Sequence, residues 1–151
     1  MTSQELYEDV QRQATDMGVR VWISMDPGTY AQDGEPYGEA GKDDDGWEAV
    51  WLSHPPTTSR AYLVALHELG HHATRWGRQL LKERESLAWE WAIEHSIIPL
   101  GPDEWATVAG YLASYDSNRA KPSERFDRLL LRARALSVPT TSRSGTTRVL
   151  E

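Results

Sequence analysis

Residues His67, Glu68 and His71 form the pattern H-E-x-x-H within the run LHELGHH. On an α-helix, residues four apart lie on the same face, about 6 Å apart along the axis. His67 and His71 can therefore offer two imidazole nitrogens to one zinc ion. Glu68 lies about 100° around the helix, close enough to a water at the metal to act as a base without being a ligand. The spacing predicts a zinc hydrolase site with two ligands, a base and one position left for water.

Two histidines in a helix can also be unrelated surface or core residues, because short motifs match by chance. The flanking sequence favours a metal site, since residues 59–76 are predicted to form an amphipathic helix. Its apolar positions follow helical spacing: Leu66, Leu69, Ala73 and Trp76. Gly70 is a poor helix former, at a cost of about 1 kcal/mol relative to Ala, so its presence needs a packing or functional reason.

A zinc site needs at least three protein ligands, and Glu85 is the main candidate for the third. Residues 79–97 are predicted to form the next helix, which ends before Pro99. Glu85 falls on the mostly apolar face of this helix, whereas Glu94 falls on the opposite face. A carboxylate that faces the core is costly unless it is paired or coordinates a metal.

Two alternatives for this position stay open. Glu85 could form an ion pair with an arginine such as Arg75 or Arg78. His95 is a rival third ligand, because H-E-x-x-H followed by a distant histidine is also a known metallopeptidase pattern. It lies about 80° from Glu85 around the helix and would need a different helix tilt.

Other polar residues have weaker predicted roles. His72 follows a candidate ligand but points elsewhere, so we expect it to support the site or to lie on the surface. His54 precedes two prolines and could line the cleft. Candidates for a donor to a reaction oxyanion are Tyr62, Tyr111 and His95.

The composition limits the class of protein. A chain of 151 residues fits one domain with a sizeable core. It has no cysteine, which excludes disulfides, thiolate nucleophiles and zinc sites built from Cys. The start, MTSQELYEDVQRQ, lacks the apolar core of a signal peptide, and no run approaches the roughly 18 apolar residues of a membrane span. We expect a soluble cytoplasmic protein.

The net charge of −7 is unevenly distributed. Residues 33–48 carry seven acidic residues and one lysine, which gives −6. Residues 119–151 carry eight basic and three acidic residues, which gives +5. We expect no direct nucleic-acid binding from an acidic protein and interpret the basic part as a solvated helix face, with a local contact as the alternative.

The remaining patterns predict an α+β chain. We expect a helix over 3–17 that stops at Gly18, a strand over 19–25, and a second strand over 47–52, antiparallel to its neighbour. The Gly-, Pro- and acid-rich segment 29–46 is predicted to be a long loop or irregular hairpin, with Ala31 or Tyr37 in short strand pairings and a turn rather than a calcium loop at Asp45-Gly46.

Two further helices are predicted after Pro99. One opens at Pro102 and runs to about Ser114, and the other is capped by Ser123. The apolar stripe of the second comprises Phe126, Leu129, Leu130, Ala133 and Leu136. We expect one domain over 1–138 and a disordered Ser/Thr-rich tail over 139–151.

With these residues assembled, the chain resembles the ImmA/IrrE-like family of zinc metallopeptidases over roughly residues 37–136. The resemblance rests on the strand WEAVWLS, a short linker, LHELGHH and then ESLAWEWAIEHSIIP. The last segment matches the family's pattern of Glu, Ala three positions on, an aromatic residue six on and Ala seven on: Glu85, Ala88, Trp91 and Ala92. The family often has Asn directly after the first Ala, where this chain has Trp89.

The resemblance implies a zinc-dependent endopeptidase in which His67, His71 and Glu85 are the metal ligands and Glu68 is the general base. It implies a regulatory substrate, typically a helix-turn-helix repressor of a phage or mobile element. For the fold we expect a small zincin-like α+β domain, in which a short antiparallel sheet packs on a mainly helical body with the H-E-x-x-H helix at its centre.

Two other functions stay open. The same fold could bind a repressor or another partner without cutting it and keep zinc as a structural element. A protease of DNA–protein crosslinks that uses His95 would fit the basic C-terminal helix. The sequence does not indicate the oligomeric state.

Overall fold

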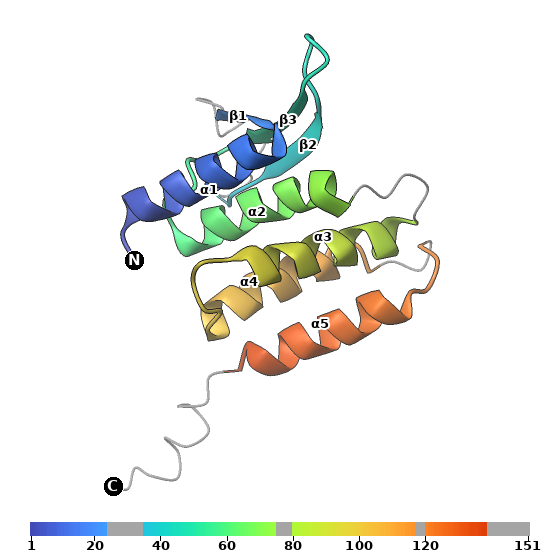
Figure 1. Cartoon of the computed structure of the whole chain (residues 1–151). Helices are drawn as coiled ribbons and strands as arrows, with labels where there is room; N and C mark the ends of the chain where they lie inside the picture. The colour runs from blue at the N-terminus through green and yellow to red at the C-terminus, as the bar shows by residue number, and fades with distance from the viewer. Residues whose placement is uncertain (24–34, 75–79, 117–119, 139–151) are drawn as a thin grey trace, which may run out of the picture.

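The computed structural model describes residues 1–23, 35–74, 80–116 and 120–138, and within these ranges the chain is an α+β protein (Figure 1). Five helices pack with a small three-stranded sheet. In chain order the elements are α1 (Ser3–Met17), β1 (Arg20–Ile23), β2 (Gly38–Lys42), β3 (Glu48–Leu52), α2 (Ser59–Thr74), α3 (Leu81–His95), α4 (Pro102–Ala113) and α5 (Glu124–Leu136). The predicted α+β class is confirmed.

The sheet is mixed, so the expectation of an antiparallel sheet is wrong. Its strand order is β1-β3-β2, with β3 parallel to β1 and antiparallel to β2. A tight turn joins β2 to β3 and makes that pair antiparallel. The Asp43 carboxylate accepts hydrogen bonds from the N–H groups of Asp45 and Trp47, and Gly46 takes a φ of 85°. The turn predicted at Asp45-Gly46 is confirmed.

Strand β2 lies in the segment that we expected to be a loop or irregular hairpin. Its sequence GEAGK contains no β-branched or aromatic residue, so strand propensity does not indicate it. The strand exists because it pairs with β3, from Gly38 opposite Leu52 to Lys42 opposite Glu48. The Tyr37 carbonyl extends this pairing by accepting a hydrogen bond from the N–H of Ser53.

Helix α2 forms the centre of the molecule, as expected. It lies between α1 and the sheet on one side and α3 and α4 on the other (Figure 1). All its residues from Ala61 to His72 are buried. The predicted single apolar stripe is therefore wrong: Leu66 and Leu69 are buried as expected, Ala73 is exposed, and a helix enclosed on all sides needs no polar face.

The helix ends follow their sequence signals. Gly18 ends α1 in the left-handed conformation with a φ of 73°. Pro102 opens α4, and the Ser123 hydroxyl caps α5 by accepting a hydrogen bond from the N–H of Phe126. The buried residues of α5 are Phe126, Leu129, Leu130 and Ala133, whereas Leu136 is exposed.

Some predictions fall outside the described residues. They concern the end of the first strand at Met25, Ala31, the end of the motif helix at Trp76, the arginines at 75 and 78, and the tail 139–151. Among the described residues, no helix has the length and apolar character that crossing a membrane requires.

Candidate metal centre

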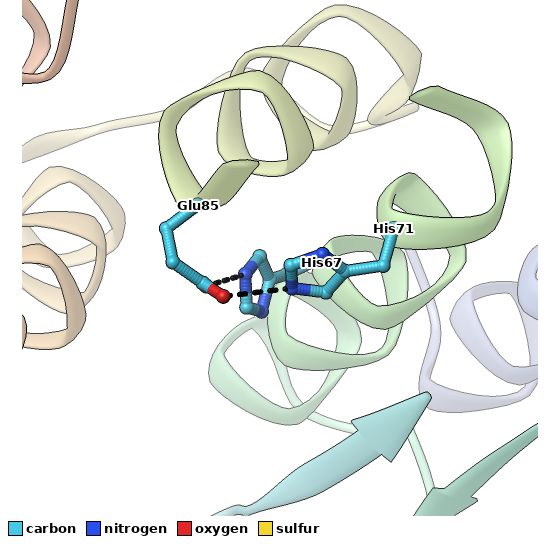
Figure 2. A group of neighbouring side chains, drawn as sticks. All are labelled: His67, His71 and Glu85. Carbon is cyan, nitrogen blue, oxygen red and sulfur yellow. Dashed lines mark hydrogen bonds and ion pairs between the residues drawn. The ribbon is translucent and has the colours of Figure 1, made fainter. Parts of the chain in front are cut away.

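His67 and His71 lie one turn apart on α2, with both side chains directed toward α3 (Figure 2). Their ring centroids are 4.6 Å apart. His67 is only 3% exposed and His71 only 9%, so both rings lie inside the protein. The predicted i, i+4 pair is therefore present at the centre of the fold.

Glu85 of α3 reaches both rings (Figure 2). Its Oε1 lies 2.9 Å from Nε2 of His67, and its Oε2 lies 3.3 Å from Nε2 of His71. Donor atoms around a tetrahedral zinc ion are about 3.3 Å apart, given bonds of roughly 2.0 Å. Donor atoms of the three residues all lie within 4.8 Å of one another, so the group could hold a metal ion.

A close helix crossing brings Glu85 to this position. A Cβ atom at Gly70 would lie 2.5 Å from the carbonyl oxygen of Ala88, which no side chain tolerates. Glycine thus lets α2 and α3 approach closely. On α2 the contact lies between His67 and His71, and on α3 it lies one turn after Glu85. This contact supplies the packing reason that a glycine in the middle of a helix requires.

The three side chains stabilise one another's charges. Burial alone would raise the pKa of the Glu85 carboxyl, but hydrogen bonds and charge from His67 and His71 lower it well below the usual range. Burial would likewise lower the pKa of His67, but Glu68 and Glu85 outweigh it and raise this pKa to about 9. A proton on His67 therefore supplies positive charge between the carboxylates, at the place where a bound cation would supply it.

Glu68 lies beside the group of three. It is 7% exposed, and its Oε2 lies 3.3 Å from Nδ1 of His67. Gly38 of β2 makes room for it, because a Cβ there would lie 2.7 Å from Cγ of Glu68. The carboxylate is thus held between α2 and the edge strand of the sheet, adjacent to His67, and is not one of the three potential ligands.

Trp89 supports His67 from α3. The two rings stack with centroids 4.3 Å apart and planes 10° from parallel. Trp89 is fully buried, and its Nε1 has no hydrogen-bond partner among the described residues. This stacking fixes the plane of the His67 ring. The sequence showed Trp89 only as a departure from the family pattern and gave no role to it.

The other histidines lie elsewhere. His95 is exposed, stacks on Trp91 and pairs through Nδ1 with the Trp91 carbonyl, so the structure does not bring it to the group. His72 is buried; it lies 2.7 Å from a Glu48 carboxylate oxygen and donates to the Ala49 carbonyl, which ties α2 to β3. His54 pairs with the Ser53 hydroxyl and does not line the two cavities described next.

Two cavities, of about 610 Å³ and about 600 Å³, flank the group. Both are lined by His67, Glu68, Gly38 and Tyr115. The first extends along α4, and the second extends along β2 to His71 and Glu85. The candidate metal centre is therefore accessible from two sides, and the edge strand runs beside it.

Tyr115 is another site residue that was not predicted from the sequence. It comes directly after Ser114, the predicted end of its helix, so no helical pattern included it. Burial raises its pKa, and the nearby charges of Glu85 and Glu68 add to this effect. Tyr115 lines both cavities, beside the two carboxylates.

The three candidates for an oxyanion donor are placed differently. The Tyr62 hydroxyl is buried, donates to Asp9 at 2.6 Å and accepts from the N–H of Ile97, away from the site. Tyr111 lines the first cavity, but its hydroxyl donates to the Pro36 carbonyl. His95, as described, is exposed.

Comparisons with known proteins found no matching family model, no matching curated protein and no matching solved structure.

Proposed function

We propose that this protein is a zinc-dependent endopeptidase. The observation that carries the proposal is the convergence of two buried imidazoles and one buried carboxylate, with a second carboxylate beside them and open cavities on two sides. Imidazole and carboxylate donors suit zinc, and two His with one Glu is a ligand set of catalytic zinc sites that leaves one position free. His67, His71 and Glu85 are the proposed ligands.

When bound, zinc would polarise the scissile carbonyl and lower the pKa of a water towards about 7. Glu68 would act as the general base, taking a proton from the attacking water and passing it to the leaving amine. Tyr115, which lines both cavities, would donate a hydrogen bond to the oxyanion that develops on the carbonyl. Trp89 and Gly70 keep the proposed ligands in position. Trp89 stacks on His67, and Gly70 sets the distance between α2 and α3.

For the substrate we propose a regulatory protein, specifically a helix-turn-helix repressor of a phage or mobile element. This part rests on the resemblance carried by LHELGHH and ESLAWEWAIEHSIIP. The test is incubation of the zinc-loaded protein with a purified repressor encoded beside it, followed by electrophoresis and mass spectrometry of fragments. Glu68→Gln should retain one zinc per chain and lose cleavage by a factor of at least about 100. Cleavage by this variant would remove Glu68 from the mechanism.

A second candidate is a non-catalytic protein that binds the same kind of partner. One observation favours it: Glu85 already pairs with both histidines, so the group can be a self-satisfied structural element. This role predicts a stable complex with the intact repressor and no fragments from either wild type or Glu68→Gln. Sedimentation of the mixture together with the fragment analysis separates binding from cutting.

A further inference from the structure

The first cavity opens beside His67 and Glu68 and has a wall made by α4. Five residues in α4 and just after its end line the cavity. They are one, three or four positions apart, so they lie on one side of the helix: Thr107, Gly110, Tyr111, Ser114 and Tyr115. The segment from Glu35 to Gly38, which leads into β2, forms another part of the lining, and Val64 of α2 also contributes to it. A substrate peptide whose scissile bond lies beside Glu68 would place the side chain of the residue next to that bond in this cavity.

Apart from Tyr115, which lies beside the carboxylates, the hydroxyl groups of the α4 wall are engaged by main-chain acceptors. Tyr111 donates to the Pro36 carbonyl, Thr107 to the Asp103 carbonyl at 3.2 Å, and Ser114 to the Tyr111 carbonyl at 2.6 Å. A ligand therefore meets mainly aromatic rings and aliphatic carbon on this wall. Such a surface favours an apolar group, which gains by leaving water.

The charges at the cavity do not select a charged ligand. Arg60 and Glu35 form an ion pair at 2.8 Å, and both side chains are about half exposed. Their charges offset each other, so the pair attracts neither sign strongly. The Glu68 carboxylate at the inner end repels an acidic side chain.

Gly110 lines this cavity on its open side, where the residue is exposed. A Cβ added there would meet nothing within 4 Å, whereas one at Gly70 or Gly38 would clash with a neighbour. Gly110 lies inside α4, where glycine is the poorest helix former apart from proline. Packing therefore does not require glycine at this position. A side chain at residue 110 would instead take up space in the cavity that Gly110 lines.

We infer that this cavity is the subsite for a large apolar or aromatic side chain of the substrate residue next to the scissile bond, and that Gly110 sets the size it accepts. The inference rests on the proposed endopeptidase function and names the substrate class for it. A volume of about 610 Å³ accommodates the largest side chains.

The first test measures binding without cleavage. The probes are the hydroxamates of acetyl-phenylalanine and acetyl-alanine, titrated calorimetrically into zinc-loaded protein. Wild type should bind the phenylalanine compound at least about 10-fold more tightly, from the additional apolar area that it buries. Gly110→Leu should lower the affinity for the phenylalanine compound at least about 10-fold and the affinity for the alanine compound less than about 2-fold. The matched control Gly110→Ala should change both affinities by less than about 3-fold.

Equal affinity of wild type for the two hydroxamates, or no binding of either, would overturn the inference whether or not the variants fold. An equal loss of affinity for the two hydroxamates in Gly110→Leu would also contradict the inference, because this outcome indicates general damage to the site. Zinc content and thermal unfolding of each variant are measured alongside, so that a folding defect is recognised.

The second test separates the subsite from the peptidase. A mixture of synthetic peptides is incubated with wild type and Gly110→Leu, and the cut positions are identified by mass spectrometry. The expected result is cleavage next to Phe, Tyr, Trp, Leu or Met, shifted to smaller residues in the variant. Cleavage without side-chain preference would refute the subsite and leave the peptidase. Selective hydroxamate binding with no peptide cut would refute the peptidase and leave only an apolar binding pocket beside the metal.

Discussion

Gly70 of α2 lies against the backbone of α3 at Ala88, where a Cβ atom would come within 2.5 Å of the carbonyl oxygen. Glu85 precedes Ala88 by one helical turn, and His67 and His71 stand on either side of Gly70 in the chain. The distance between the two helices therefore determines whether the carboxylate reaches both imidazoles.

The substitution Gly70→Ala should force the helices apart. We expect the free energy of unfolding of the metal-free protein to fall by about 1–3 kcal/mol from overpacking, although Ala is the better helix former. Zinc affinity should fall as well, because Glu85 moves away from the histidines. Urea unfolding and a zinc titration against a chelator measure the two effects.

Gly110→Ala is the matched control for Gly70→Ala, since its new methyl group meets open space. This variant should be more stable than wild type by about 0.5–1 kcal/mol and should bind zinc normally. If the two alanine variants changed stability in the same direction and by the same amount, the helix contact at Gly70 would not be what positions Glu85.

Removal of the third ligand should weaken the metal site selectively. We expect Glu85→Gln to lower zinc affinity by at least about 100-fold, more than the usual loss for a residue that only supports a ligand. Glu94→Gln is the control on the same helix, because this carboxylate is exposed on another face. His95→Ala should also retain zinc. Zinc loss in His95→Ala, with retention in Glu85→Gln, would favour the rival ligand.

The stability of the metal-free protein should depend on pH through two groups with opposite shifts. The pKa of His67 is raised to about 9, so its contribution is complete below its unfolded pKa of about 6.5 and is lost as pH rises through 9. The pKa of Glu85 is lowered, so its contribution is present above about pH 4.5 and is lost as pH falls through the lowered folded value.

Urea unfolding between pH 4 and 10 should therefore place the maximum between about pH 4.5 and 6.5, with a decline on the order of a few kcal/mol by pH 9. In His67→Gln the decline between pH 6.5 and 9 should be much smaller. A wild-type protein that gained stability over this interval would contradict the charge distribution described for the group.

Tyr115→Phe should affect the chemical step more than substrate binding. The loss of one donor to a developing oxyanion costs about 100- to 1,000-fold in kcat in other hydrolases, and we expect a loss in this range with KM changed less than about 3-fold. Zinc content should stay at the wild-type level. A change in KM alone would assign Tyr115 to binding, and an unchanged kcat would remove it from the mechanism.

The helices could be predicted from the sequence because their signals are local. Gly18, Pro102 and Ser123 mark ends that the structure keeps, and the apolar spacing of Phe126 and Leu129 identifies a buried face. The group of His67, His71 and Glu85 could also be anticipated, since a carboxylate on an apolar helix face after H-E-x-x-H needs a partner.

What the sequence could not give depends on contacts between distant segments. Strand β2 has no strand-forming residues and exists through its pairing with β3, so the mixed sheet was not predictable from alternation. Gly38 and Tyr115 were missed for related reasons: one lies in the segment expected to be a loop, and the other lies just past a predicted helix end. The role of Gly110 depends on a cavity that only the packed structure reveals.

The proposal depends most on one zinc ion held jointly by α2 and α3. Zinc K-edge X-ray absorption of the zinc-loaded protein measures this directly. We expect four neighbours at roughly 2.0–2.2 Å, two of them imidazole nitrogens and two of them oxygens, with one oxygen from the carboxylate of Glu85. A spectrum with three imidazoles, or with only the oxygen shell of hydrated zinc, would contradict it.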